Sequence, residues 1–89
     1  MKATKVVVGG RVQGVGFRWS TRRAAERIGV RGWVRNRADG SVEVHVEGDE
    51  ARVAAMLAWL RRGPDGAVIG DLEVADIEPE GMESFEIRE

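Results

Sequence analysis

Strict alternation of apolar and polar residues between Ser41 and Glu47 is the feature that most restricts how this chain can fold. Three valines lie on one side of the segment, and two glutamates and a histidine lie on the other (Val42, Val44, Val46; Glu43, His45, Glu47). Because neighbouring side chains of a β-strand point to opposite faces, the pattern predicts a strand with one buried and one solvent-facing side. On this interpretation His45 is an exposed residue without a chemical role.

A second segment, from Val30 to Asn36, alternates in the same way. Its two faces carry three residues each (Val30, Gly32, Val34; Arg31, Trp33, Arg35). The dipeptide Asp39-Gly40, between the two segments, is typical of a hairpin turn. The two strands are therefore expected to pair as an antiparallel hairpin, with Trp33 on the open face of the sheet.

Two other segments repeat apolar residues at helical spacing. The first runs from Phe17 to a capping glycine, Gly29, and its apolar residues form one stripe (Phe17, Ala24, Ala25, Ile28). The second begins at Gly48-Asp49-Glu50, with an N-cap residue and acids in its first turn, and ends at Gly63-Pro64. Its stripe follows the i, i+3, i+4, i+7 pattern (Val53, Met56, Leu57, Leu60).

The remaining apolar runs complete a β-α-β-β-α-β order. Residues 3–10 predict a first strand, and residues 67–77 predict a strand whose imperfect alternation indicates a bulge or a sheet edge. Residues 85–88 are expected to add a short last strand. Two helices with one apolar face each are accommodated if both pack on the same side of an antiparallel sheet. We therefore expect residues 1–89 to form a single α+β domain, a ferredoxin-like βαββαβ sandwich.

The composition excludes several classes of function. The chain has 89 residues with no cysteine and one histidine, so it lacks a disulfide framework, a thiolate nucleophile and a multi-histidine metal site. Hydrophobic residues make up 43% and charged residues 33%, which is typical of a globular domain rather than a disordered segment. No apolar run is long enough for a transmembrane segment or a signal peptide, so we expect a cytoplasmic protein without a membrane partner.

Charge is divided unevenly along the chain, although the formal net charge is −1. Residues 1–40 hold ten Lys or Arg against two acids, a net charge of +8, whereas residues 41–89 hold four Arg against 13 acids, a net charge of −9. Such segregation indicates an anionic partner for the basic half. Nucleic acid, an acidic protein and a small phosphate all fit this description.

A glycine-rich loop lies in the basic half, between the first strand and the first helix. Its sequence is Gly10-Arg11-Val12-Gln13-Gly14-Val15-Gly16-Phe17-Arg18. Backbone N–H groups at a helix N-terminus lack partners inside the helix, and glycines allow the preceding loop to curl around an anion. Arg18 would place its guanidinium on phosphate oxygens. Taken alone, such a loop is more often a flexible connector, and it fits neither a Walker loop nor a dinucleotide-binding fingerprint.

The segment from Val8 to Arg18 resembles the first signature of the acylphosphatase family, G-x-V-Q-G-V-x-F-R, at every fixed position. The segment from Gly32 to Glu43, with Gly48 beyond it, is similar to the second signature of that family. The similarity covers essentially the whole chain. It implies a ferredoxin-like enzyme that hydrolyses the carboxyl-phosphate bond of small acyl phosphates without a metal or another cofactor.

The same resemblance assigns roles to individual residues. It implies that Arg18 binds the phosphate and that Asn36 positions the attacking water, whose proton passes to the substrate phosphate. The backbone of the loop is expected to cradle the phosphate (Gln13, Gly14, Val15, Gly16, Phe17). Inorganic phosphate is the expected product inhibitor, and a monomer is the expected state. On local grounds alone, Asn36 is as easily a residue that begins the turn towards Asp39-Gly40.

Three alternatives compete with this interpretation. A ferredoxin-like module could bind RNA or another anion without catalysis, but the strand at 41–47 presents acids, the three tryptophans share no stacking spacing, and the pI of about 5.9 is low for a nucleic-acid-binding protein. The absence of cysteine disfavours a metal chaperone on the same fold. Acylphosphatase-like modules also occur within larger hydrogenase-maturation proteins, whereas we expect this chain to act alone.

Overall fold

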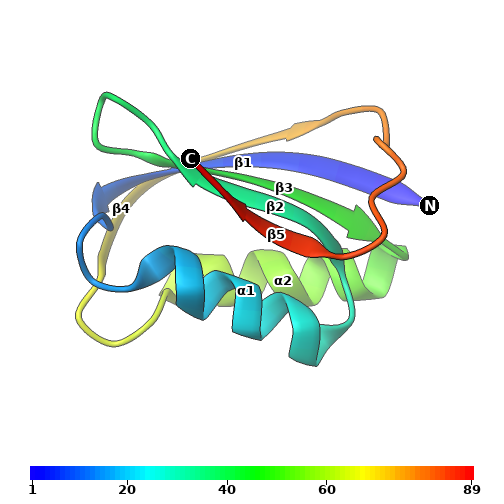
Figure 1. Cartoon of the computed structure of the whole chain (residues 1–89), viewed down its shortest axis with the longest axis horizontal. Coiled ribbons are helices and arrows are strands. Elements are labelled where there is room, and N and C mark those ends of the chain that lie inside the picture. Colours follow the sequence, from blue (N-terminus) through cyan, green and yellow to red (C-terminus); the bar gives the residue numbers. More distant parts are fainter.

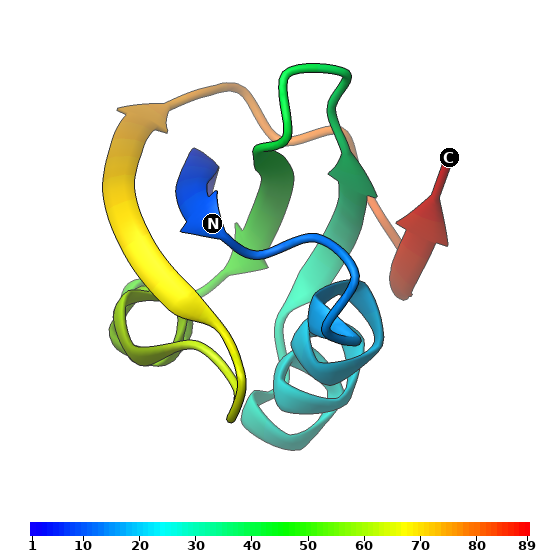
Figure 2. The ribbon, with the colours of Figure 1, turned by 90° about the vertical axis from the view of Figure 1, so that its left-hand side faces the viewer.

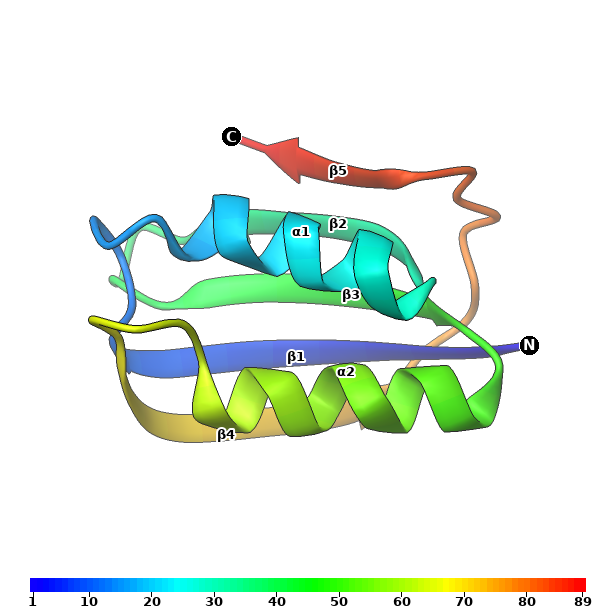
Figure 3. The same ribbon diagram turned by 90° about the horizontal axis from the view of Figure 1, so that it is seen from below.

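The computed structural model describes residues 1–89, which form two layers, a five-stranded sheet and a pair of helices (Figure 1). The elements follow one another as β1 (Lys2–Arg11), α1 (Phe17–Ile28), β2 (Arg31–Asn36), β3 (Val42–Gly48), α2 (Glu50–Arg62), β4 (Val68–Asp76) and β5 (Phe85–Arg88). Both helices lie on the same face of the sheet, as Figure 3 shows. The predicted element order and the ferredoxin-like α+β architecture are therefore confirmed.

The strands are arranged in the order β4-β1-β3-β2-β5, so β4 and β5 lie at opposite edges of the sheet (Figure 2). Four strands pair antiparallel, but β5 pairs parallel to β2. The expectation of a wholly antiparallel sheet is therefore wrong, and the sheet is mixed. The cause is the connection 77–84, which leaves one edge of the sheet, crosses its outer face and returns β5 along the opposite edge (Figure 3).

The core fills the space between the sheet and the helices. The sheet contributes mainly valines, and three of them, on β3, show no exposed surface (Val42, Val44, Val46). The helical stripes meet these valines with buried residues of α1 and α2 (Phe17, Ala24, Ala25; Val53, Met56, Leu60). The alternation and stripe predictions thus hold on this face, with Leu57 and Ile28 only partly buried.

The opposite face of β3 differs from its prediction. His45 is 1% exposed and Glu47 is 0% exposed, so His45 is not a solvent-facing bystander. Trp33 is also buried and stacks on His45, with ring centroids 5.6 Å apart and 7° between the ring planes. The physical reason is the 77–84 connection, which covers this part of the outer face. The polar side chains are thereby enclosed although their alternation is that of a half-exposed strand.

The far end of β1 is shaped by a sheet irregularity. The pairing of β1 with β4 shifts register between Val8 and Gly10, which confirms the bulge or edge predicted for residues 67–77. Gly10 has φ +112°, and a side chain there would meet the backbone oxygen of Val68 at 2.3 Å. Only glycine fits this close approach of two backbones. The chain leaves the sheet here and enters the loop that leads to α1.

Candidate active site

The loop between β1 and α1 owes its shape to two glycines. Gly14 has φ +79° and Gly16 has φ +73°, a region of backbone conformation that other residues rarely adopt. Nothing lies within 4 Å of a side chain built on either residue. Backbone conformation, rather than crowding, therefore explains these two glycines. A left-handed residue next to a helical one is the arrangement that turns successive N–H groups towards an anion.

The N-terminus of α1 follows directly and has no side-chain cap. Gly16 is the N-cap residue and carries no side chain, and the first turn of the helix holds no acidic residue. By contrast, α2 is capped by Asp49, which accepts a hydrogen bond from the backbone N–H of Arg52 at 2.8 Å. The first N–H groups of α1 and the positive end of its dipole thus stay open to a ligand.

Gln13 fixes the loop to the hairpin that joins β2 and β3. Its side-chain Nε2 donates hydrogen bonds to the backbone oxygens of Arg37, at 2.8 Å, and Ser41, at 2.9 Å. The hairpin is closed by its own bonds, including that from the Arg37 N–H to the oxygen of Ser41. Asp39 accepts from both the N–H and the hydroxyl of Ser41, so it serves the turn. Loop and hairpin are therefore held in one fixed relation.

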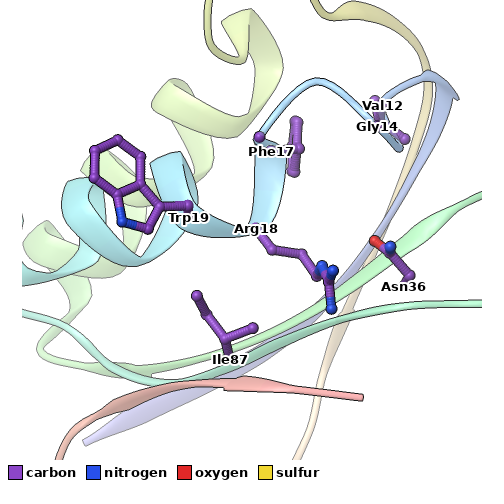
Figure 4. Close-up of a pocket in the computed structure, with 8 residues that line it drawn as sticks. Val12, Gly14, Phe17, Arg18, Trp19, Asn36 and Ile87 are labelled. Atoms are coloured by element: carbon purple, nitrogen blue, oxygen red, sulfur yellow. The ribbon is translucent and has the colours of Figure 1, made fainter.

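A cavity of about 190 Å³ opens where the loop, the start of α1 and the end of β2 meet. Eight residues line it (Val12, Gly14, Gly16, Phe17, Arg18, Trp19, Asn36, Ile87). Arg18 is the second residue of α1 and Asn36 is the last residue of β2. Figure 4 shows the Arg18 side chain extending towards Asn36. The cavity is smaller than the usual pocket for a drug-sized ligand, which suits a small phosphorylated molecule.

Arg18 gives this cavity its charge. It is the only charged residue in the lining and forms none of the ion pairs of the protein, whereas Arg22, Arg35 and Arg52 each pair with a carboxylate. Arg18 is half-buried, and its guanidinium donates to no other residue, so its donors stay available to a ligand. A positive charge without a counter-ion, next to an open helix N-terminus, favours an anion with several oxygens.

The predicted site residues are brought together in part. Arg18, Asn36, Gly14, Gly16 and Phe17 all line the cavity. Two members of the predicted cradle do not: the Gln13 side chain clamps the loop, and Val15 packs partly buried against the core.

Three further residues line the cavity although the sequence assigns them no functional role: Val12, Trp19 and Ile87. Trp19 directly follows Arg18, so its position near the site could have been predicted from the sequence. Ile87 had no such signal, because it reaches the cavity only through the parallel pairing of β5 with β2, in which it lies opposite Val34.

Comparison with known proteins gives a consistent result. Residues 4–87 match the sequence model of the acylphosphatase family. The chain is 54% identical over 78 residues to an acylphosphatase of Thermococcus kodakarensis, covering 88% of this chain and 86% of that protein. It is 49% identical over 88 residues to an acylphosphatase of Thermotoga maritima, covering 99% and 98%. The crystal structure of an acylphosphatase from Bacillus subtilis superposes over the full length of both chains, with a TM-score of 0.96 and 34% identity. This chain therefore belongs to the acylphosphatase family.

Proposed function

We propose that this protein hydrolyses acyl phosphates to a carboxylate and inorganic phosphate, with Arg18 and the loop backbone holding the phosphoryl group and Asn36 orienting the water. The observation that carries the proposal is the meeting of an unpaired guanidinium, an uncapped helix N-terminus and a neutral amide in one small cavity. Family membership supplies the reaction, and the lining supplies groups suited to it.

The substrate explains why so few groups suffice. The leaving group of an acyl phosphate is a carboxylate of low pKa, so no strong general acid is needed to release it. The protein has to hold the phosphoryl group, stabilise the charge that spreads over its oxygens and align the water. The forked donors of Arg18 and the N–H groups at Gly14, Gly16 and the start of α1 serve the first two tasks.

Asn36 serves the third task. Its amide offers both donors and an acceptor, so it can hold a water molecule in a defined orientation. It forms no hydrogen bond through its side chain within the protein and ends a strand whose following hairpin is fixed, which is a rigid mount for such a group. No Asp, Glu or His lines the cavity. We assign the proton of the attacking water to an oxygen of the substrate phosphate.

The proposal extends to the form in which the protein acts. The chain itself covers the sheet on both sides. The helices cover one face, and the 77–84 connection covers part of the other (Figures 1 and 3). This arrangement supports a single domain of residues 1–89 that works as a monomer, with inorganic phosphate as a competitive inhibitor. Neither helix has the length and apolar character needed to cross a membrane. A cytoplasmic location stays a prediction of the sequence.

Hydrolysis of benzoyl phosphate in the presence of EDTA tests the function. We expect the purified protein to exceed the spontaneous rate by several orders of magnitude and to keep that rate when metal ions are chelated. Arg18→Ala should lose most of this activity. Arg61→Ala is the matched control, because Arg61 is an exposed arginine of α2 in no ion pair and outside the cavity. A wild-type rate equal to the spontaneous rate would show the proposal to be wrong.

A further inference from the structure

We infer that a groove on the outer face of the sheet, the face away from the helices, is a second ligand site that binds a small zwitterion, such as a short peptide with free termini. We call it the outer groove. It shares no lining residue with the cavity at Arg18. The inference therefore concerns a separate site and does not depend on the proposed function.

Two adjoining cavities form the outer groove. One, of about 430 Å³, lies between β1, β4 and the 37–41 hairpin, and the other, of about 420 Å³, continues along β1 and β4. Both are lined by Val7, Arg37 and Glu73, so they form one continuous groove. The hairpin rises on this side of the sheet (Figure 1), with β1 and β3 between it and the edge strand β4. Each cavity has the size of a site for a small molecule.

Charged side chains of both signs line the outer groove without pairing. Two are cations (Lys5, Arg37) and two are carboxylates (Asp71, Glu73), and none of the four takes part in an ion pair of the protein. A fifth charged residue, Asp39, already accepts two hydrogen bonds within its turn. Opposite charges that line one groove but do not meet leave space between them, which a ligand that contacts both can fill.

The placement of these charges selects the class of ligand. Both carboxylates belong to β4, whereas Arg37 extends from the hairpin on the other side. A ligand of one charge would be attracted by one pair and repelled by the other. A zwitterion meets both pairs favourably: its ammonium donates to Asp71 and Glu73, and its carboxylate accepts from the forked donors of Arg37. A short peptide with free termini carries these two groups at the ends of its chain.

The backbone that carries Arg37 is fixed before a ligand arrives. Its N–H donates to the oxygen of Ser41 at 2.8 Å. Its oxygen accepts from Nε2 of Gln13 at 2.8 Å and from the N–H of Gly40 at 3.2 Å. A site whose frame is already ordered binds a ligand at a smaller entropic cost.

The floor of the outer groove is kept open by Gly9. This residue has no positive φ, and a side chain built on it would meet Cβ of Asp71 at 3.7 Å, an ordinary contact distance. Neither backbone conformation nor crowding therefore requires a glycine here. Its effect is to leave space on the floor beside Val7, where a ligand can lie against the strand.

Titration of the ¹⁵N-labelled protein with glycine, diglycine and triglycine tests the inference. The three probes carry the same end groups at increasing separation. We expect at least one to shift the amide signals of β4 and the 37–41 hairpin in a saturable way, with a Kd of about 1 mM for two charge-assisted contacts. The N-acetylated and the C-amidated form of that probe should each bind at least about tenfold more weakly. No saturable shift with any of the three would overturn the inference, and so would equal binding of the blocked forms.

Neutral variants locate the bound probe. Arg37→Gln and Glu73→Gln should each raise its Kd about tenfold. Arg61→Gln and Glu83→Gln are the charge-matched controls, because both residues are exposed, form no ion pair and lie outside the outer groove, and they should keep the wild-type Kd. Arg18→Ala should keep it too. Binding that is lost in Arg18→Ala and kept in Arg37→Gln would place the probe in the cavity at Arg18 and overturn the inference. Because the two groove variants alter different elements, a folding defect in one leaves the other to decide.

Discussion

His45 and Glu47, two residues apart on β3, are joined side chain to side chain: Nε2 of His45 lies 2.6 Å from Oε2 of Glu47, and neither is exposed. Glu47 also accepts hydrogen bonds from the backbone N–H groups of Glu80 and Met82. Since the carboxylate only accepts, His45 donates through Nε2. The Trp33 indole N–H adds a bond to the Glu80 carboxylate at 3.2 Å. One buried carboxylate therefore fastens the 77–84 connection to the sheet.

Replacement of Glu47 by glutamine should weaken the fold. The amide has one oxygen for three donors, and its own N–H groups would face donors that the carboxylate satisfies. We expect the free energy of unfolding at pH 7, measured in urea, to fall by about 3 kcal/mol. Glu26→Gln is the control, because Glu26 forms an exposed helix pair with Arg22 and should change the value by less than about 1 kcal/mol. Equal losses in the two variants would contradict this role for Glu47.

The environment of the Glu47 carboxylate also predicts that the fold loses stability in acid. Burial alone would raise the pKa of Glu47, but the hydrogen bonds from His45, Glu80 and Met82 outweigh it and hold the pKa below its ordinary value of 4.5. A carboxyl with a lowered pKa in the folded state stabilises that state above its unfolded pKa and loses this effect as the pH falls through the folded pKa. Melting temperatures should therefore drop below about pH 4.5, and less steeply in Glu47→Gln. If the melting temperature falls equally with pH in the wild type and in Glu47→Gln, Glu47 does not cause the loss of stability.

Local patterns predict the architecture well where local contacts decide it. The valines of β3 and the stripe of α2 depend on spacing alone, and Asp49 caps its helix as its position indicates. His45 shows where this reasoning ends. Its alternation with Glu43 and Glu47 is that of an exposed strand face, and its burial is caused by residues 77–84, which carry no periodic signal of their own.

The residues of the site also differ in whether the sequence or distant contacts in the fold determine their position. The motif residues Arg18 and Asn36 meet in the cavity as the family resemblance implies, although local patterns alone leave Asn36 as easily a turn residue. Ile87 could not be predicted, because its position depends on the direction in which a four-residue strand joins the sheet. The cradle role of Gln13 stays a prediction, because its side chain clamps the loop and does not line the cavity. Its loop position is evident from the motif, whereas its contacts to Arg37 and Ser41 span more than 20 residues of sequence.

Arg18→Lys separates charge from geometry at the phosphate site. Lysine keeps the positive charge but loses the planar fork that matches two phosphate oxygens. We expect kcat/KM for benzoyl phosphate to fall about 100-fold in Arg18→Ala and by an intermediate factor in Arg18→Lys. The inhibition constant of inorganic phosphate should rise in both. A lysine variant with wild-type kinetics would show that charge alone suffices.

Asn36→Ala should separate turnover from phosphate binding. Without the amide the water loses its orientation, so kcat should fall about 100-fold, while Arg18 and the loop still bind phosphate. Steady-state kinetics with inorganic phosphate as inhibitor measures both quantities in one experiment. Weakened phosphate inhibition with an intact kcat would reverse the roles assigned to Asn36 and Arg18.

Gln13→Glu tests whether the clamp between loop and hairpin shapes the site. Glutamate is nearly isosteric, but its carboxylate cannot donate to the backbone oxygens of Arg37 and Ser41, which it would repel. We expect a loss of about 2 kcal/mol in unfolding free energy, for two hydrogen bonds, and a raised inhibition constant for phosphate, because the loop N–H groups are no longer held in place. Gln13→Ala removes the same bonds without the repulsion and should show smaller changes of the same sign. If both variants lose stability but bind phosphate as the wild type does, the clamp supports the fold and not the cradle.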